Sequence, residues 1–313
     1  CSSNDSTKVF FLVGFPALQD FQTILFVVFL LLYLLILAGN AVTITVVVMD
    51  HTLHKPMYFF LINLSVLDVL FTTTTIPKML LMFLTNAKTI SFQGCFLQMY
   101  SFHSLTVTEA LLLVVMAYDR YEAICNPLCY PAKMTRRMNI QLAASAWITA
   151  LLILVPVVTQ TSQLPYGHTT RVHHCFSDHL AVVQAACLDS SADFQTFLGL
   201  SIAMAVSIVP LLLVTISYIH IILSILRINS KAGRTKAFST CTSHLLVVGT
   251  YYSSITSSIT VAYVSYRADM PTDVHIMSNV VFSILTPLLN PIIYALRNDE
   301  VKSAVKKSIF QKL

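Results

Sequence analysis

The chain has 313 residues, of which 56% are hydrophobic and only 11% are charged, and its formal net charge is +5. A soluble domain usually carries about 25% charged residues, so this composition excludes an ordinary soluble fold and indicates an integral membrane protein. The modest positive charge is not gathered into a basic block with interleaved aromatic residues, so we expect no nucleic-acid partner.

Seven apolar segments are long enough to cross a bilayer, which takes about 20 residues of helix. The first of them, from Ile24 to Met49, contains no charged residue. The sequence therefore predicts an all-α membrane protein, a seven-transmembrane helix bundle that forms a single domain over residues 1–313. The predicted spans are 22–49, 57–84, 93–125, 139–161, 195–228, 236–264 and 273–296.

The segments outside the bundle differ in character. Residues 1–21 are expected to be an extracellular N-terminus, residues 22–296 the helix bundle, and residues 297–313 a cytoplasmic helix and tail. In the last segment Val301, Ala304, Val305 and Ile309 share one helical face, while the lysines lie elsewhere. This pattern predicts a short amphipathic C-terminal helix on the membrane surface.

The distribution of Lys and Arg sets the expected orientation. Of the 19 such residues, 14 fall at one end of the spans and 5 at the other. Because cytoplasmic loops are enriched in Lys and Arg, the richer end is expected to be cytoplasmic, in a multi-pass plasma-membrane protein. The N-terminus and the loop 162–194 are then outside, and Asn4 begins a glycosylation sequon that agrees with this.

Several short motifs stand at the ends of the spans, in a fixed order along the chain. They are Gly39-Asn40, PMYFFL (56–61), MAYDRY (116–121), KAFSTC (236–241) and LNPIIY (289–294). Together they resemble the odorant (olfactory) receptors, a branch of the rhodopsin-like (class A) G-protein-coupled receptors, over nearly the whole chain.

This resemblance implies a receptor rather than an enzyme. It implies that a small-molecule odorant binds in the outer half of the bundle and that a heterotrimeric stimulatory G protein is activated, which raises cAMP. Membrane lipid is the remaining expected partner. No cofactor is expected, apart from a candidate sodium ion near Asp68 and Glu109.

The outer loop departs from the family pattern. Gly167 and Ser177 stand where cysteines are expected, and the segment 174–187, HCFSDHLAVVQAAC, is more similar to fish-type or class I members. An oxidising exterior permits a disulfide between this loop and the third span. Cys95–Cys175 is the preferred pairing that the resemblance implies, and Cys95–Cys187 is the alternative.

The acid–base pair Asp119-Arg120 ends the third span. The resemblance implies that the two side chains pair in the resting receptor and that Arg120 changes partner on activation, as a half-buried guanidinium can. The alternative is an ordinary charge that reaches water at the membrane surface. The other expected members of this activation switch are Tyr121, Tyr218, Asn290, Pro291 and Tyr294.

Two carboxyl groups lie inside otherwise apolar spans, where an ionisable group is a functional candidate. Glu109 precedes Arg120 by 11 residues, about 16 Å deeper along the helix. Asn40, Asp68, Glu109 and Asn290 are expected to converge into a polar relay that holds sodium or water. The alternative is a protonated, hydrogen-bonded structural acid.

The resemblance places the ligand pocket between the third, fifth, sixth and seventh spans. Residues spaced three and four apart share one helical face, and two such stripes combine apolar groups with a few hydroxyls and one imidazole. Helix packing is the alternative role for each residue, and no acid of the outer bundle is expected near His103. The predicted pocket residues are His103, Thr106, Val107, Ala110, Ile202, Val206, Tyr252, Ile255, Thr256, Ile259 and Val280.

Other functions fit less well. A trace-amine receptor needs an Asp in the third span, but the position before His103 is Phe102, which offers a cation only a contact with its ring. A transporter usually shows internal repeats and paired broken helices, which are not evident. The histidines of the outer loop match no standard zinc pattern, so no metal site is expected.

Overall fold

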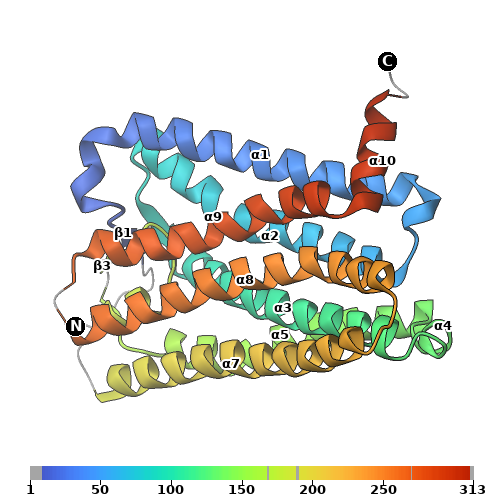
Figure 1. Cartoon of the computed structure of the whole chain (residues 1–313). Helices are drawn as coiled ribbons and strands as arrows, with labels where there is room; N and C mark the ends of the chain where they lie inside the picture. Colours follow the sequence, from blue (N-terminus) through green and yellow to red (C-terminus); the bar gives the residue numbers. More distant parts are fainter. Residues whose placement is uncertain (1–8, 168, 188–189, 269, 311–313) are drawn as a thin grey trace.

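The computed structural model describes residues 9–167, 169–187, 190–268 and 270–310 (Figure 1). Within these residues, 7 helices are long and apolar enough to cross a membrane, which confirms the predicted fold class. They are α1 (Gln22–Met49), α2 (Pro56–Thr85), α3 (Phe92–Cys125), α5 (Arg136–Ser162), α7 (Ser190–Leu226), α8 (Lys231–Arg267) and α9 (Thr272–Arg297).

Several of these helices begin at a hydroxyl cap. The side chain of Ser91 accepts the N–H of Gly94 at 3.1 Å before α3, and Thr135 accepts the N–H of Met138 at 3.3 Å before α5. Such caps satisfy backbone donors that have no partner within the helix. They explain why α3 and α5 start at these positions, within a few residues of the predicted spans.

The bundle is apolar outside and carries its polar groups inside. On α1, Leu35 is 60% exposed whereas Asn40 is fully buried. This is the reverse of a soluble fold and is what an apolar surrounding requires, because only the interior can offer hydrogen bonds. Figure 1 shows α3 running through the middle of the bundle, where it packs against α2, α5, α7 and α8.

A small sheet covers one end of the bundle. The strand β1 (Val9–Leu12) pairs antiparallel with β2 (Thr89–Ser91) and parallel with β3 (Thr169–Val172). Phe10 of β1 is buried, with ring centroids 5.8 Å from Phe92 and 5.1 Å from Tyr166. This sheet was not predicted, because its strands are too short to show a periodic pattern.

The predicted Cys95–Cys175 bridge is not formed, since both residues are buried free thiols. Cys175 directs its sulfur to Met79 of α2, with 3.9 Å between the two sulfur atoms. Ser177 takes the place beside Cys95, and its backbone N–H donates to Gln98, one turn further along α3, at 2.9 Å. The alternative Cys95–Cys187 pairing is wrong too, because Cys187 is disulfide-bonded whereas Cys95 is free.

The predicted C-terminal helix is α10 (Asp299–Phe310), which turns away from the axis of α9 (Figure 1). Val301 and Ala304 are buried against the bundle, and Lys302 and Lys306 are exposed, as an amphipathic helix requires. The expected glycosylation site at Asn4 lies outside the described residues and stays a prediction.

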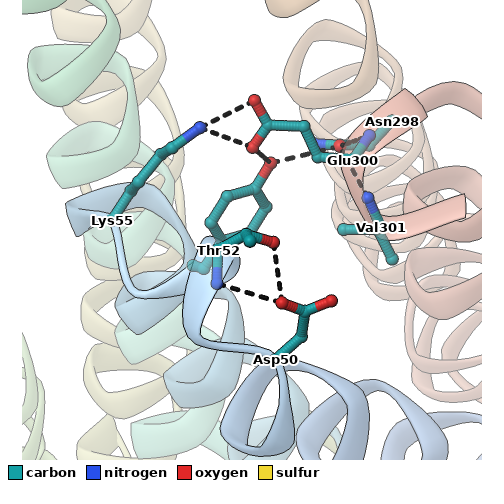
Figure 2. A network of polar contacts seen from close by, with 7 residues as sticks. Asp50, Thr52, Lys55, Asn298, Glu300 and Val301 are labelled. Carbon is teal, nitrogen blue, oxygen red and sulfur yellow. Dashed lines mark hydrogen bonds and ion pairs between the residues drawn. The ribbon is translucent and has the colours of Figure 1, made fainter. Parts of the chain in front are cut away.

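A polar junction fixes α10 against the start of α2 (Figure 2). The ammonium of Lys55 lies 2.7 Å from both carboxylate oxygens of Glu300, and the Tyr58 hydroxyl donates to Glu300 at 2.9 Å. Burial raises the pKa of the Glu300 carboxyl, but bonds from Lys55 and Tyr58 outweigh it and leave the pKa below its usual value. Asn298 completes the junction by accepting the N–H groups of Glu300 and Val301, both at 3.1 Å.

Candidate ligand pocket and intramembrane polar network

A cavity of about 130 Å³ lies between α3, α5, α7, α8 and α9, at the end of the bundle that carries the sheet. A cavity of about 150 Å³ is known to accommodate benzene, so this space suits a small compact molecule. Of the predicted pocket residues, those that line it are His103, Thr106, Val107, Ile202, Val206, Ile255 and Ile259.

The remaining predicted pocket residues lie elsewhere. Ala110, Tyr252 and Val280 are buried in the bundle but do not line the cavity, and Thr256 is exposed on its outer surface. The stripe predicted for α8 begins three residues, about one helical turn, too early. Its cavity-facing stripe is Ile255, Ser258, Ile259 and Ala262.

Other lining residues were missed. Ser258 and Ala262 could have been found by extending the stripe from Ile255 at helical spacing. Asp178 and His179 could not, because they lie in the outer loop, and no local pattern shows that the loop folds back over the cavity. The missed residues are Phe102, Leu154, Val157, Val158, Asp178, His179, Leu180, Thr196, Gly199, Leu200, Ala203, Ser258, Ala262, Asn279 and Phe282.

Gly199 of α7 makes room for the loop. A Cβ atom at this position would lie 2.4 Å from the Cε1 atom of His179, which is far inside van der Waals contact. The imidazole of His179 therefore rests on the bare backbone of α7, with its Nε2 atom 3.1 Å from the Thr161 hydroxyl of α5. Two helices thus hold the loop histidine at the wall of the cavity.

The imidazole of His103 is a polar group of the cavity whose Nε2 atom lacks a hydrogen-bond partner among the described residues. Its Nε2 atom is buried and forms no hydrogen bond with any residue that the structure describes. A buried nitrogen without a partner costs free energy, which a hydrogen bond to a ligand would recover. The expectation that no acid lies near His103 was wrong, because Asp178 of the loop also lines the cavity.

Asp178 belongs to a cluster that joins the loop to α9. Its carboxylate accepts the N–H of Ala181 at 3.3 Å and lies 3.8 Å from Nε2 of His275. The amide nitrogen of Asn279 is 3.2 Å from Nε2 of His174, and the hydroxyl of Ser258 donates to the amide oxygen of Asn279. This cluster closes the cavity with mutually bonded polar groups, in contrast to the unpaired His103.

Burial decides the charge states in this loop. It lowers the pKa of His174 to about 3 and that of His179 to about 4, so both imidazoles are neutral at pH 7. Burial alone would raise the pKa of Asp178, but the imidazoles of His275 and His174 outweigh it and hold the pKa below its usual value. The carboxyl group of Asp178 is therefore ionised at neutral pH.

The predicted polar relay is present in part. Asp68 is fully buried and accepts from the amide of Asn290 at 3.1 and 3.2 Å, which joins α2 to α9. Glu109 is also fully buried, with Asp68 and Asn290 as polar neighbours, yet neither carboxyl oxygen is hydrogen-bonded within the described chain. Asn40 instead donates to the carbonyl of Pro287 at 3.2 Å and ties α1 to α9.

Asp119 and Arg120 form the predicted pair, with 2.6 Å between Nη2 of Arg120 and Oδ2 of Asp119. The other carboxylate oxygen accepts from the hydroxyl of Tyr130 at 2.8 Å. Arg120 is only 8% exposed, so it is no freely solvated charge. The pair is held between α3 and the short helix α4 (Tyr130–Lys133).

The other predicted switch residues surround this end of α3. Tyr218 of α7 contacts Nδ1 of His244 at 2.7 Å, and Nε2 of His244 lies 3.2 Å from the carbonyl of Leu113. The hydroxyl of Tyr294 is buried and has no partner among the described residues. Two other members lie in packing contacts, Tyr121 beside His220 and Pro291 beside Gly39.

Comparison with known proteins decides the family. The family model described as "Olfactory receptor" matches residues 29–312. The chain belongs to the olfactory receptor family. Human olfactory receptor 2AT4 is 59% identical over 310 residues, which cover 99% of this chain and 95% of that protein. Human olfactory receptor 6N1 is 43% identical over 300 residues, with 96% and 94% covered.

The fold agrees with this assignment. The crystal structure of squid rhodopsin superposes with a TM-score of 0.76 at 15% identity, over 97% of this chain and 91% of that one. The chain is thus a multi-pass olfactory receptor with the rhodopsin-like fold, a signalling receptor and not an enzyme. The family implies a small-molecule ligand and coupling to a G protein. The expected likeness to fish-type or class I members stays a prediction.

Proposed function

We propose that this olfactory receptor binds a small odorant in the cavity beside His103 and activates a stimulatory G protein, which raises cAMP. The observation that carries the proposal is the buried Nε2 atom of His103, which has no hydrogen-bond partner in the described chain. The best ligand is then a compact apolar molecule with one carbonyl group that accepts from this imidazole.

The orientation follows from charge. The end with Arg120 and α10 carries most of the Lys and Arg residues, so it faces the cytoplasm of a plasma-membrane receptor. The cavity then opens toward the outside, with the loop of Asp178 and His179 over it. Proteolysis of intact and permeabilised cells tests this, because the tail after residue 297 should be cleaved only after permeabilisation.

Activation in this proposal separates Arg120 from Asp119. The pair is buried and also held by Tyr130, so it opens only when a competing arrangement replaces these bonds. Tyr218 and Tyr294 are the neighbouring hydroxyls available to a rearranged Arg120. The G protein binds to the cytoplasmic opening that this movement creates.

In this proposal the buried acids Asp68 and Glu109 form a polar relay between the ligand cavity and the cytoplasmic end of the bundle. The oxygens of Glu109 form no hydrogen bond within the described chain, and Asp68 and Asn290 are their polar neighbours. Carboxylate and amide oxygens suit a sodium ion or an ordered water, which would satisfy Glu109 and connect α2, α3 and α9.

A panel of odorants tested with a cAMP readout is the deciding experiment. Carbonyl compounds should raise cAMP, and hydrocarbons of the same size should be weaker. Volatile amines belong in the panel because Asp178 lines the cavity. A response to amines alone would replace the proposed ligand class with that of an amine receptor, and a calcium response without cAMP would exclude the stimulatory G protein.

A further inference from the structure

A second hollow lies far from the ligand cavity, where α1 ends and α2 and α5 begin. It is a groove of about 660 Å³ whose floor includes the buried residues Leu53 and Met134. Val48 and Ile140, which are 55% and 48% exposed, form part of its sides. In a bilayer these side chains meet lipid, so the groove is open to an acyl chain.

Polar groups gather at one place in this groove. Asn139 is 6% exposed and lines the groove, and its side-chain oxygen has no hydrogen-bond partner in the part of the chain that the structure describes. Arg136 stands one turn earlier, at the first position of α5, and forms no ion pair with any described acid. The start of α5 adds backbone N–H groups that favour an anion.

Lys55 adds a second cation at the rim. Lys55 lines the same groove. Its ammonium also forms an ion pair with Glu300, as Figure 2 shows. The groove thus presents two cations, the start of a helix and one buried acceptor above an apolar floor. The complementary molecule carries two anionic groups, one hydrogen-bond donor and an acyl chain.

We propose that this groove binds phosphatidylserine. Its phosphate and carboxylate lie against Arg136, Lys55 and the start of α5, its ammonium donates to the side-chain oxygen of Asn139, and an acyl chain follows Phe59 and Ile62 of α2. Anionic lipids of this kind are enriched in the cytoplasmic leaflet. The inference rests on the proposed orientation for its place in the cell, but not for the binding itself.

The test is titration of the purified full chain in detergent with phosphatidylserine, with bound lipid counted by native mass spectrometry. Arg136→Gln should weaken binding about 5-fold, the typical effect of one cation near a lipid headgroup. Asn139→Leu should weaken it to a similar extent, because the ammonium loses its acceptor. Arg137→Gln is the matched control, since Arg137 is equally exposed and does not line the groove.

Each other outcome overturns the proposal. If Arg136→Gln and Arg137→Gln weaken phosphatidylserine binding equally, the attraction is due to diffuse positive charge and not to this groove. If phosphatidylcholine binds as well as phosphatidylserine, the groove holds an acyl chain without recognising the headgroup. Equal binding of phosphatidic acid, which lacks the ammonium, would exclude the role of Asn139. Arg136 is exposed, so its variant stays informative if Asn139→Leu fails to fold. No odorant or G protein is present, so failure here leaves the proposed receptor function intact.

Discussion

The two ends of the bundle handle polar groups in different ways. At the cavity end, the Nε2 atom of His103 is buried without a partner in the described chain, and the imidazoles of His174 and His179 above it are neutral. At the other end, acids and bases are paired, as in Asp119 with Arg120 and Glu122 with Lys133. A ligand can therefore add a missing bond at the first end, whereas the release of Arg120 at the second must break bonds already made.

The largest effect is expected from Arg120→Ala. This change removes the cation that must change partner, so agonist-stimulated cAMP should be abolished while the receptor still reaches the cell surface. The measurement is cAMP beside surface labelling. Arg137→Ala is the control, because Arg137 is exposed and should leave signalling unchanged. Normal signalling by a surface-expressed Arg120→Ala receptor would show that the pair is only structural.

A large gain in stability is expected from Ser177→Cys at the cavity end. The Ser177 side chain lies beside the free thiol of Cys95, so the new cysteine should form a disulfide there. Such bridges typically contribute about 2–4 kcal/mol. Thermal unfolding of the purified receptor with and without reductant measures the gain, and non-reducing peptide mapping identifies the bond. A bond from the new cysteine to Cys175 instead would mean that the loop is placed differently.

Acid should weaken the packing of the outer loop at the cavity end. The pKa values of His174 and His179, about 3 and 4, lie below the ordinary 6.5, so the folded chain binds fewer protons than the unfolded chain between these values. Stability is then full above about pH 6.5 and falls as the pH drops toward 4, by up to about 1.4 kcal/mol per pH unit for each group.

Thermal unfolding between pH 7 and pH 5 measures this dependence, and His179→Gln should make it shallower. An unchanged pH dependence in the variant would mean that His179 is not buried in the receptor.

A smaller effect is expected from His103→Ala. Loss of one hydrogen bond to the ligand should raise the half-maximal concentration of the best carbonyl agonist about 10-fold, or about 1.4 kcal/mol. Surface level and agonist-independent signalling should not change. Thr256→Ala is the matched control, because Thr256 lies on the outer surface of α8. If both variants give unshifted dose–response curves for every agonist, His103 is a packing residue.

Sequence reasoning succeeded where helical spacing alone decides the neighbours. The apolar spans predicted the bundle, and the spacing of His103, Thr106 and Val107 predicted their common face on α3. It failed for Tyr252 and Thr256, because the stripe on α8 begins at Ile255, three residues after the predicted start. The positions of Asp178 and His179 at the cavity could not be predicted from the sequence, because the path of their loop depends on packing against α7 and α9 rather than on a local pattern.

The junction of Lys55, Tyr58 and Glu300 also has a consequence for biosynthesis. The first two residues leave the ribosome about 240 residues before Glu300, so the contact cannot form until all the membrane spans have been made. Until then Lys55 and Tyr58 lack their partner at the membrane surface. The contact of Lys55 and Tyr58 with Glu300 therefore forms among the last steps of assembly. Its presence indicates a receptor in which every helix has been inserted.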